Sequence, residues 1–162
     1  MITWQKAILN RVNAGFVSLI IFPCIFLSAA ITYGAPLNWC NSKAKALSIA
    51  QREGKIILLI AGRDICSKTN HMRNICETDI PVQTLIEQHF VPWYCDSDSS
   101  KEWYVYAQGL SGSFDLPLIC CINPSNSSKF LDRSTGKQTA TDFLDCLQAI
   151  INSQPKLHKN KR

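Results

Sequence analysis

The sequence predicts an α/β domain in which an apolar strand leads through a short loop into a helix that begins beside a cysteine. Residues 55–61 form an apolar run that ends at Gly62, which is typical of a central parallel strand covered on both faces. Helical and strand-like stretches alternate through the rest of the chain. About 125 residues follow the apolar N-terminal segment, enough for one domain with one core and too few for two.

The first 35 residues have the organisation of an export signal. Residues 1–13 carry Lys6 and Arg11 and no acidic residue, and residues 14–33 are almost wholly apolar, with small residues at their end. This apolar segment is close to the roughly 20 residues that span a bilayer, so an uncleaved inner-membrane anchor is the alternative to a cleaved signal peptide. Either way, we expect the remainder to be exported, to the periplasm or another extracytoplasmic space.

The positive charge of the chain lies mostly at its two ends. Of the formal net charge of +5, the N-terminal segment contributes two charges, and four more lie in residues 154–162, a predicted basic tail. The predicted domain, residues 36–153, is therefore close to neutral. No stretch interleaves basic and aromatic residues as nucleic-acid sites do, so we predict no nucleic-acid partner. Contact with a membrane is expected only through an uncleaved N-terminal segment.

Capping residues and hydrophobic spacing place the first elements. Asn41 or Ser42 can cap a helix that runs to residue 53, and Gly54 can end it. The central strand over residues 55–61 follows directly. A second helix is predicted over residues 67–76, after a connection that is too polar and too short to be anything else.

The second half of the chain alternates short elements with turns. A break over residues 78–81 precedes a helical turn or two, and Pro92 in the next strand indicates a sheet edge or a bulge. Thr139 can cap the last helix, which carries an apolar stripe. The remaining predicted elements are helical turns over 82–88, a strand over 89–95, a short aromatic helix over 101–108, strands over 118–123 and 128–132, and a turn over 134–136.

Cys66 stands where the loop after the central strand enters the second helix. A thiol in the first turn of a helix faces unpaired N–H groups and the positive end of the helix dipole, and both favour the thiolate. Arg63 and Lys68 would favour the thiolate as well, whereas Asp64 would oppose it. The competing interpretation is a small buried hydrophobic residue, as free cysteines often are.

The chain carries seven cysteines besides Cys24, which lies in the N-terminal segment. In an oxidising compartment they permit disulfides, and their odd number leaves at least one unpaired within the chain. Their spacings match no zinc pattern, so we predict no metal and no cofactor. Neighbouring strand residues point to opposite faces, and the last cysteine lies beside an apolar stripe where it is expected to pack. The seven are Cys40, Cys66, Cys76, Cys95, Cys120, Cys121 and Cys146.

Several motifs stand in the order of the thioredoxin family over residues 38–152. They are Trp39 before the first helix, Cys66-x-x-Thr69-x-x-Met72 where the family has Cys-x-x-Cys-x-x-Met, Asp96-x-Asp98 after the second strand, and Leu116-Pro117 opening the third. The chain resembles most the exported thioredoxin-related proteins of bacteria described as thiol:disulfide interchange or disulfide isomerase proteins. The resemblance implies a thioredoxin-like fold: a four-stranded mixed sheet flanked by helices, with an extra N-terminal helix.

The resemblance also implies roles for three residues. Cys66 takes the position of the nucleophile, and Pro117 that of the proline whose preceding bond is cis in the family and faces the active cysteine. Thr69 stands where the family has its resolving cysteine. Threonine cannot attack a mixed disulfide, so the usual two-cysteine cycle is not available. Its hydroxyl could still donate a hydrogen bond to a Cys66 thiolate.

Three hypotheses follow for the chemistry. Cys66 acts alone on cysteine-containing exported proteins, as an isomerase or reductase whose mixed disulfides are released by an external thiol or a membrane reductase. Alternatively, a second cysteine resolves them. Cys95, at the end of a parallel strand, is better placed than Cys76, which continuous helix would hold about 15 Å away. In the third, exchange has been lost and the domain is a redox-inactive binding or chaperone module with structural disulfides.

Overall fold

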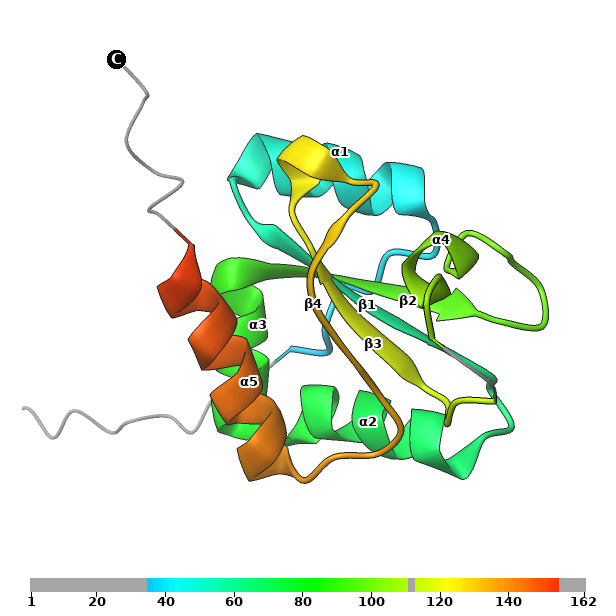
Figure 1. Cartoon of the computed structure of the whole chain (residues 1–162). Coiled ribbons are helices and arrows are strands. Elements are labelled where there is room, and N and C mark those ends of the chain that lie inside the picture. Colours follow the sequence, from blue (N-terminus) through cyan, green and yellow to red (C-terminus); the bar gives the residue numbers. More distant parts are fainter. Residues whose placement is uncertain (1–34, 111–112, 155–162) are drawn as a thin grey trace, which may run out of the picture. The chain divides into compact units, whose positions relative to one another are not determined.

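A four-stranded mixed sheet with the order β2-β1-β3-β4 organises the fold (Figure 1). The central strand β1 (Ile56–Gly62) pairs in parallel with β2 (Phe90–Asp96) and antiparallel with β3 (Leu118–Ile122). β3 pairs antiparallel with β4 (Phe130–Thr135) at the other edge. This mixed sheet is the one that the resemblance implies.

The computed structural model describes residues 35–110 and 113–154. The predicted signal or anchor, with its apolar residues 14–33, lies outside this part of the chain, and so does the basic tail beyond residue 154. Within the described ranges, no helix is long and apolar enough to cross a membrane.

Helices cover both faces of the sheet (Figure 1). One face packs against α2 (Ser67–Thr78), α3 (Ile80–His89) and α5 (Ala140–Ser153). The other face packs against α1 (Lys43–Glu53), which is the extra N-terminal helix, and α4 (Tyr104–Ala107). A strand covered on both sides can be apolar at every position, and all seven residues of β1 are buried, as predicted.

The alternation of strand residues divides the core into two clusters. Leu58 and Ile60 of β1 pack under α2, α3 and α5, whereas Ile57 and Leu59 pack under α1 and α4. The adjacent cysteines of β3 follow the same rule: Cys121 belongs to the first cluster and Cys120 to the second, which confirms the prediction.

The predicted helix caps and the edge strand are confirmed. The Ser42 hydroxyl accepts a hydrogen bond from the Lys45 N–H, and Gly54 ends α1 with φ of +66°. Thr139 caps α5. The outer edge of β2 contains Pro92, whose carbonyl accepts from the Cys40 N–H at 2.8 Å in a short bridge. Proline fits here because it has no N–H to offer to a neighbouring strand.

The break between α2 and α3 is shorter than predicted. Asp79 alone separates the helices, ending α2 and capping α3 through its side chain, which accepts from the Val82 N–H. Pro81 lies in the first turn of α3, where its missing N–H costs no helical hydrogen bond. The proline therefore starts a helix here instead of interrupting one.

Two further boundaries and the burial of one cysteine differ from the prediction. β4 runs over Phe130–Thr135, so the expected turn at 134–136 is reduced to Gly136, which has φ of +78°. α4 is only four residues long, where the sequence predicted a helix over 101–108. Cys146 is exposed, because the buried stripe of α5 consists of Phe143, Leu147 and Ile150 and the cysteine lies off that stripe.

The end of β1 touches α2 where Gly62 lies against Thr69. A Cβ atom on Gly62 would stand 2.8 Å from the Thr69 Cγ2 atom and would also overlap its hydroxyl. The Thr69 side chain is fully buried, so it has no free space into which to move. The close approach of strand to helix therefore requires a glycine at position 62.

We predict that Gly62→Ala lowers the free energy of unfolding by about 1–3 kcal/mol, the usual cost of overpacking a core. Urea denaturation followed by circular dichroism measures the change. In a Thr69→Ala background the same substitution should cost much less, because the two overlapping atoms are gone. An equal cost in both backgrounds would show that the contact does not set the requirement for glycine.

Candidate active site

A tight turn delivers Cys66 to the N-terminus of α2. The Cys66 N–H donates to the Arg63 carbonyl at 3.0 Å, which closes the turn after β1. Cys66 itself is the N-cap residue of α2, with extended backbone angles, and its carbonyl accepts from the Asn70 N–H at 3.0 Å. The Asn70 side chain donates to the Asp64 carbonyl at 2.8 Å and fastens the turn to the helix. The thiol thus lies at the helix N-terminus, as the sequence predicts.

An open hollow of about 510 Å³ lies beside Cys66. The turn and the first residues of α2 form one wall, and the segment Phe114 to Leu116 before β3 forms the other. Ile65, next to the cysteine, is 79% exposed. The Leu116–Pro117 peptide bond is cis, as the resemblance implies, and Pro117 is buried directly behind Leu116. The structure therefore brings Cys66 and the segment that leads into Pro117 to the same hollow.

The surroundings of Cys66 favour its ionised form. The pKa of the Cys66 thiol is lowered, first by the backbone N–H of Thr69, then by the Thr69 hydroxyl, and to a smaller extent by the N–H and charge of Lys68, against the opposing effect of burial. Both N–H groups belong to the first turn of α2, where no carbonyl of the helix can accept from them. This is the helix-terminus effect expected for a cysteine in this position.

Thr69 has an unusual buried hydroxyl. Its Oγ1 atom is buried and has no hydrogen-bond partner among the described residues. A thiol is a weak acceptor, but a thiolate accepts hydrogen bonds readily. The hydroxyl can therefore donate to the sulfur when Cys66 is ionised, which is the sense in which it lowers the pKa.

The two cations beside Cys66 are paired with acids far away in the sequence. Lys68 Nζ lies 2.8 Å from Asp115 Oδ2. Asp115 is 47 residues further along the chain and belongs to the opposite wall of the hollow. Arg63 Nε lies 2.9 Å from Asp98 Oδ2. No periodic pattern in the sequence points to either pair, so Asp115 and Asp98 were not predicted as partners of these cations.

The other six described cysteines have the opposite character. Desolvation by burial is the main cause that raises their pKa values, to about 12 for Cys120. All seven described cysteines are free thiols in this structure. Within the described residues, no group of three or more His, Cys, Asp or Glu side chains could hold a metal ion.

The two candidate resolving cysteines are placed differently. Cys95 is in register with Ala61 near the C-terminal end of β1, so it lies toward the same end of the strands as Cys66. Its side chain, however, is buried in the cluster under α1 and α4. Cys76 lies in the same helix as the Cys66 cap, and α2 continues without a break to Thr78. The early helix end that Cys76 would need to reach Cys66 is absent from α2.

His71 of α2 contacts the segment before α5. It is half-buried, and its Nε2 atom lies 3.1 Å from the Gln138 carbonyl just before α5. Among the aromatic residues, Trp93 and Tyr106 are fully buried, Trp103 is nearly so, and Tyr104 is 48% exposed.

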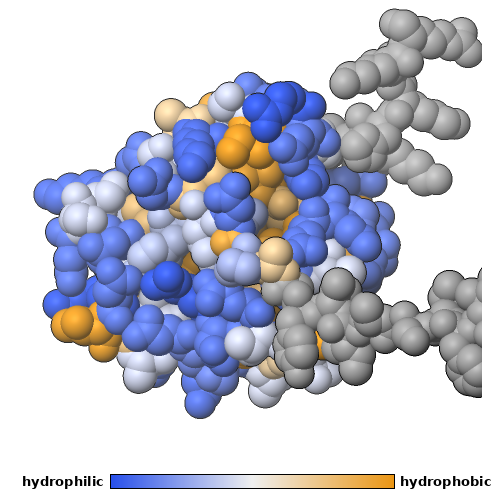
Figure 2. All heavy atoms as spheres, turned by 180° about the vertical axis from the view of Figure 1, so that it is seen from behind, coloured by the Kyte–Doolittle hydropathy of each residue, from blue (hydrophilic) through white to orange (hydrophobic). Residues whose placement is uncertain are grey.

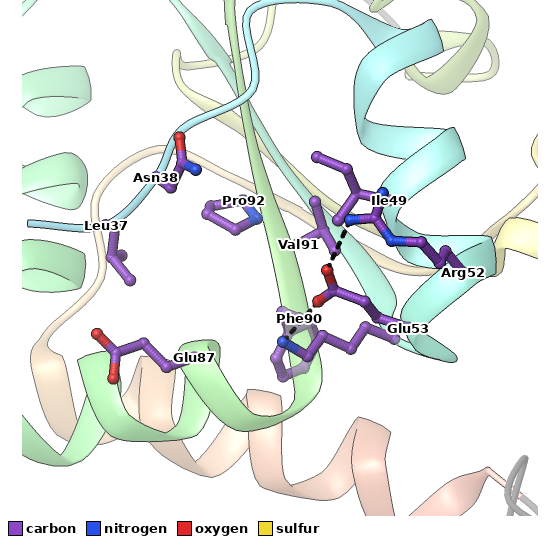
Figure 3. Close-up of a pocket in the computed structure, with 10 residues that line it drawn as sticks. Leu37, Asn38, Ile49, Arg52, Glu53, Glu87, Phe90, Val91 and Pro92 are labelled. Atoms are coloured by element: carbon purple, nitrogen blue, oxygen red, sulfur yellow. Dashed lines mark hydrogen bonds and ion pairs between the residues drawn. The ribbon is translucent and has the colours of Figure 1, made fainter.

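A second hollow, of about 250 Å³, lies near the start of β2 and the end of α1 (Figure 3). Leu37, Ile49 and Val91 contribute apolar side chains, and Glu53 pairs with both Arg52 and Lys55 beside them. Seen from behind, the molecule is mostly hydrophilic, with hydrophobic residues gathered in a hollow (Figure 2). No cysteine lines the smaller hollow. We therefore take the hollow at Cys66 as the candidate active site, because it is the one of the two that contains a thiol.

We predict that Thr69→Val raises the pKa of Cys66, because valine keeps the shape of the side chain but cannot donate to the sulfur. The measurement is the rate of iodoacetamide alkylation against pH, with peptide mapping of the labelled site. Thr69→Ser is the matched control and should leave the pKa low. A Thr69→Val profile that superimposes on the wild type would contradict this role of the hydroxyl.

Comparisons with known proteins give similarity in structure alone. No family model matches the sequence, and no curated protein matches it. A thioredoxin from Thermus thermophilus superimposes with a TM-score of 0.59 and 19% identity, covering 79% of this chain and 100% of that one. A disulphide isomerase from Xylella fastidiosa Temecula1 gives 0.55 and 18%, covering 73% and 99%.

A poplar thioredoxin h mutant gives a TM-score of 0.55 with 17% identity, covering 78% of this chain and 91% of that one. These identities are too low to carry an activity from one protein to another, and fold alone does not define function. The agreement lies in the arrangement of strands and helices over most of each chain. The protein has a thioredoxin fold.

Proposed function

We propose that this protein carries out thiol–disulfide exchange with Cys66 as its single active-site nucleophile. One observation carries the proposal: among the seven described cysteines, Cys66 alone combines a position on an open hollow with a lowered pKa. The thiolate is the nucleophile in exchange, so a lowered pKa increases the reactive fraction near neutral pH. The other described cysteines have raised pKa values, and burial is the main cause.

The first step forms a mixed disulfide. The Cys66 thiolate attacks one sulfur of a substrate disulfide, a bond forms between the two sulfurs, and the second substrate sulfur leaves as a thiolate. In isomerisation, another substrate thiolate then attacks the substrate sulfur of the mixed disulfide and releases Cys66 unchanged. In reduction, two external thiols supply the electrons: they leave as a disulfide, and the substrate leaves as two thiols.

The residue at position 69 limits the direction of exchange. An oxidant that transfers its own disulfide needs a second cysteine within reach of the first, and Thr69 occupies the place of that cysteine. This supports isomerisation or reduction driven by an external thiol or a membrane reductase. The similarity in fold to a protein described as a disulphide isomerase is consistent with this direction.

The proposed setting is outside the cytoplasm. The basic and then apolar organisation of the N-terminal 35 residues supports export, either with cleavage or with residues 14–33 retained as an anchor. Structural disulfides form and persist in such compartments, so exported cysteine-containing proteins are the proposed substrates.

A redox-inactive binding or chaperone module is the second candidate. The observation in its favour is the buried Thr69, which stands in place of the resolving cysteine and fills that position in the core. In such a module Cys66 would not need to react. The two candidates therefore differ in whether activity depends on the Cys66 sulfur.

The discriminating experiment is the reactivation of a model protein with scrambled disulfides in a glutathione buffer. We predict that the wild type accelerates reactivation, that Cys66→Ser reduces it to the rate of buffer alone, and that Cys95→Ser keeps most of the activity. Equal rates for the wild type and Cys66→Ser would favour the binding module. Loss of activity in Cys95→Ser, with the fold intact by circular dichroism, would replace the single-cysteine mechanism by one with a resolving cysteine.

A further inference from the structure

The side chains of Tyr94 and Arg73 form a cluster with Asp64, the acidic residue two positions before Cys66. The Tyr94 hydroxyl donates to Asp64 Oδ1 at 2.7 Å, and Arg73 Nη1 lies 3.2 Å from the same oxygen. The Arg73 guanidinium also stacks on the Tyr94 ring, 4.3 Å from the ring centre. These residues come from the turn, from α2 and from β2, so the cluster fastens the turn to both the helix and the sheet.

Asp64 is important because its charge would oppose a thiolate at Cys66 if the carboxylate lay close to the sulfur. The Cα atoms of Asp64 and Cys66 lie at most about 7 Å apart, because only one residue stands between them. The Debye length at physiological ionic strength is about 8 Å, so salt would only partly screen a carboxylate that turned toward the sulfur. A carboxylate that was free to approach the sulfur would raise the pKa of Cys66.

We propose that Tyr94 and Arg73 are positioning residues for Cys66: they hold the Asp64 carboxylate on the β2 side of the turn and offset its charge. The inference rests on the proposed function, because it concerns the reactivity of the same sulfur. It explains how an acid can stand two positions before a nucleophile without suppressing it.

The contacts restrain Asp64 at both its side chain and its backbone. The Tyr94 hydroxyl also lies 3.1 Å from the Gly62 carbonyl. The Asp64 carboxylate is closer and charged, so the hydroxyl donates its hydrogen bond to the carboxylate. The Asp64 carbonyl accepts from the Asn70 side chain. The side chains of Arg73 and Asp64 are 31% and 65% exposed, and such an ion pair contributes little alone. The phenol hydrogen bond and the stacked ring supply the remaining restraint.

The other charged groups around the turn have partners of their own. Arg63 pairs with Asp98 and Lys68 pairs with Asp115. Asp96, at the end of β2, accepts from the Asp98 N–H at 3.2 Å. Because substitutions at positions 73 and 94 leave these contacts in place, a change in Cys66 reactivity reports on Asp64.

The test is the pH dependence of Cys66 alkylation in the full-length chain, with peptide mapping of the label. Tyr94→Phe removes the hydroxyl and keeps the ring, and Arg73→Gln removes the positive charge. Both should raise the apparent pKa of Cys66 by about half a unit or more, which slows alkylation near neutral pH about threefold. The matched controls are Tyr104→Phe and Arg52→Gln, which should not move the profile.

A second background isolates the charge of Asp64. In Asp64→Asn, the added Tyr94→Phe substitution should no longer shift the profile, because no carboxylate remains to be held. An unchanged profile in Tyr94→Phe and Arg73→Gln, with native circular dichroism, would overturn the inference, as would an equal shift in both backgrounds. If wild-type Cys66 itself titrates near the ordinary thiol value of about 8.5, the proposed function fails instead.

Discussion

The contact between Gly62 and Thr69 fixes the geometry on which the rest of the site depends. β1 is buried on both faces and pairs with a strand on each side, so its end is a rigid point. Because glycine lets the fully buried Thr69 side chain rest on that end, α2 starts close to the sheet. Cys66 caps this helix. Only three residues separate it from the end of β1, so the strand and the helix together set its position.

The same contact explains why the threonine can serve two purposes. Its side chain fills the space against Gly62, and its hydroxyl and N–H favour the Cys66 thiolate. On the proposed mechanism, this arrangement activates the Cys66 sulfur, and position 69 supplies no second one. Exchange would then be completed by another thiol, which suits isomerisation and reduction better than net oxidation.

Much of the fold was predictable because its signals are local. Unbroken apolar character identified β1, capping residues identified the ends of α1 and α5, and Pro92 identified an edge strand. The errors had two origins: Asp79 joins α2 to α3 through local capping hydrogen bonds that were not recognised, whereas the tertiary pairing with β3 extends β4 to Thr135. Likewise, Cys66 was found from its place before a helix, but Tyr94, Asp98 and Asp115 come from distant elements and carry no pattern that points to it.

The measurement that tests the central claim most directly is mass spectrometry of the covalent product formed when the reduced protein meets a disulfide-bonded peptide. Our account predicts one mixed disulfide, on the Cys66 sulfur, that persists until an external thiol is added because Thr69 cannot resolve it. An adduct on another cysteine, or rapid conversion of the Cys66 adduct into an internal disulfide of this chain, would contradict the account.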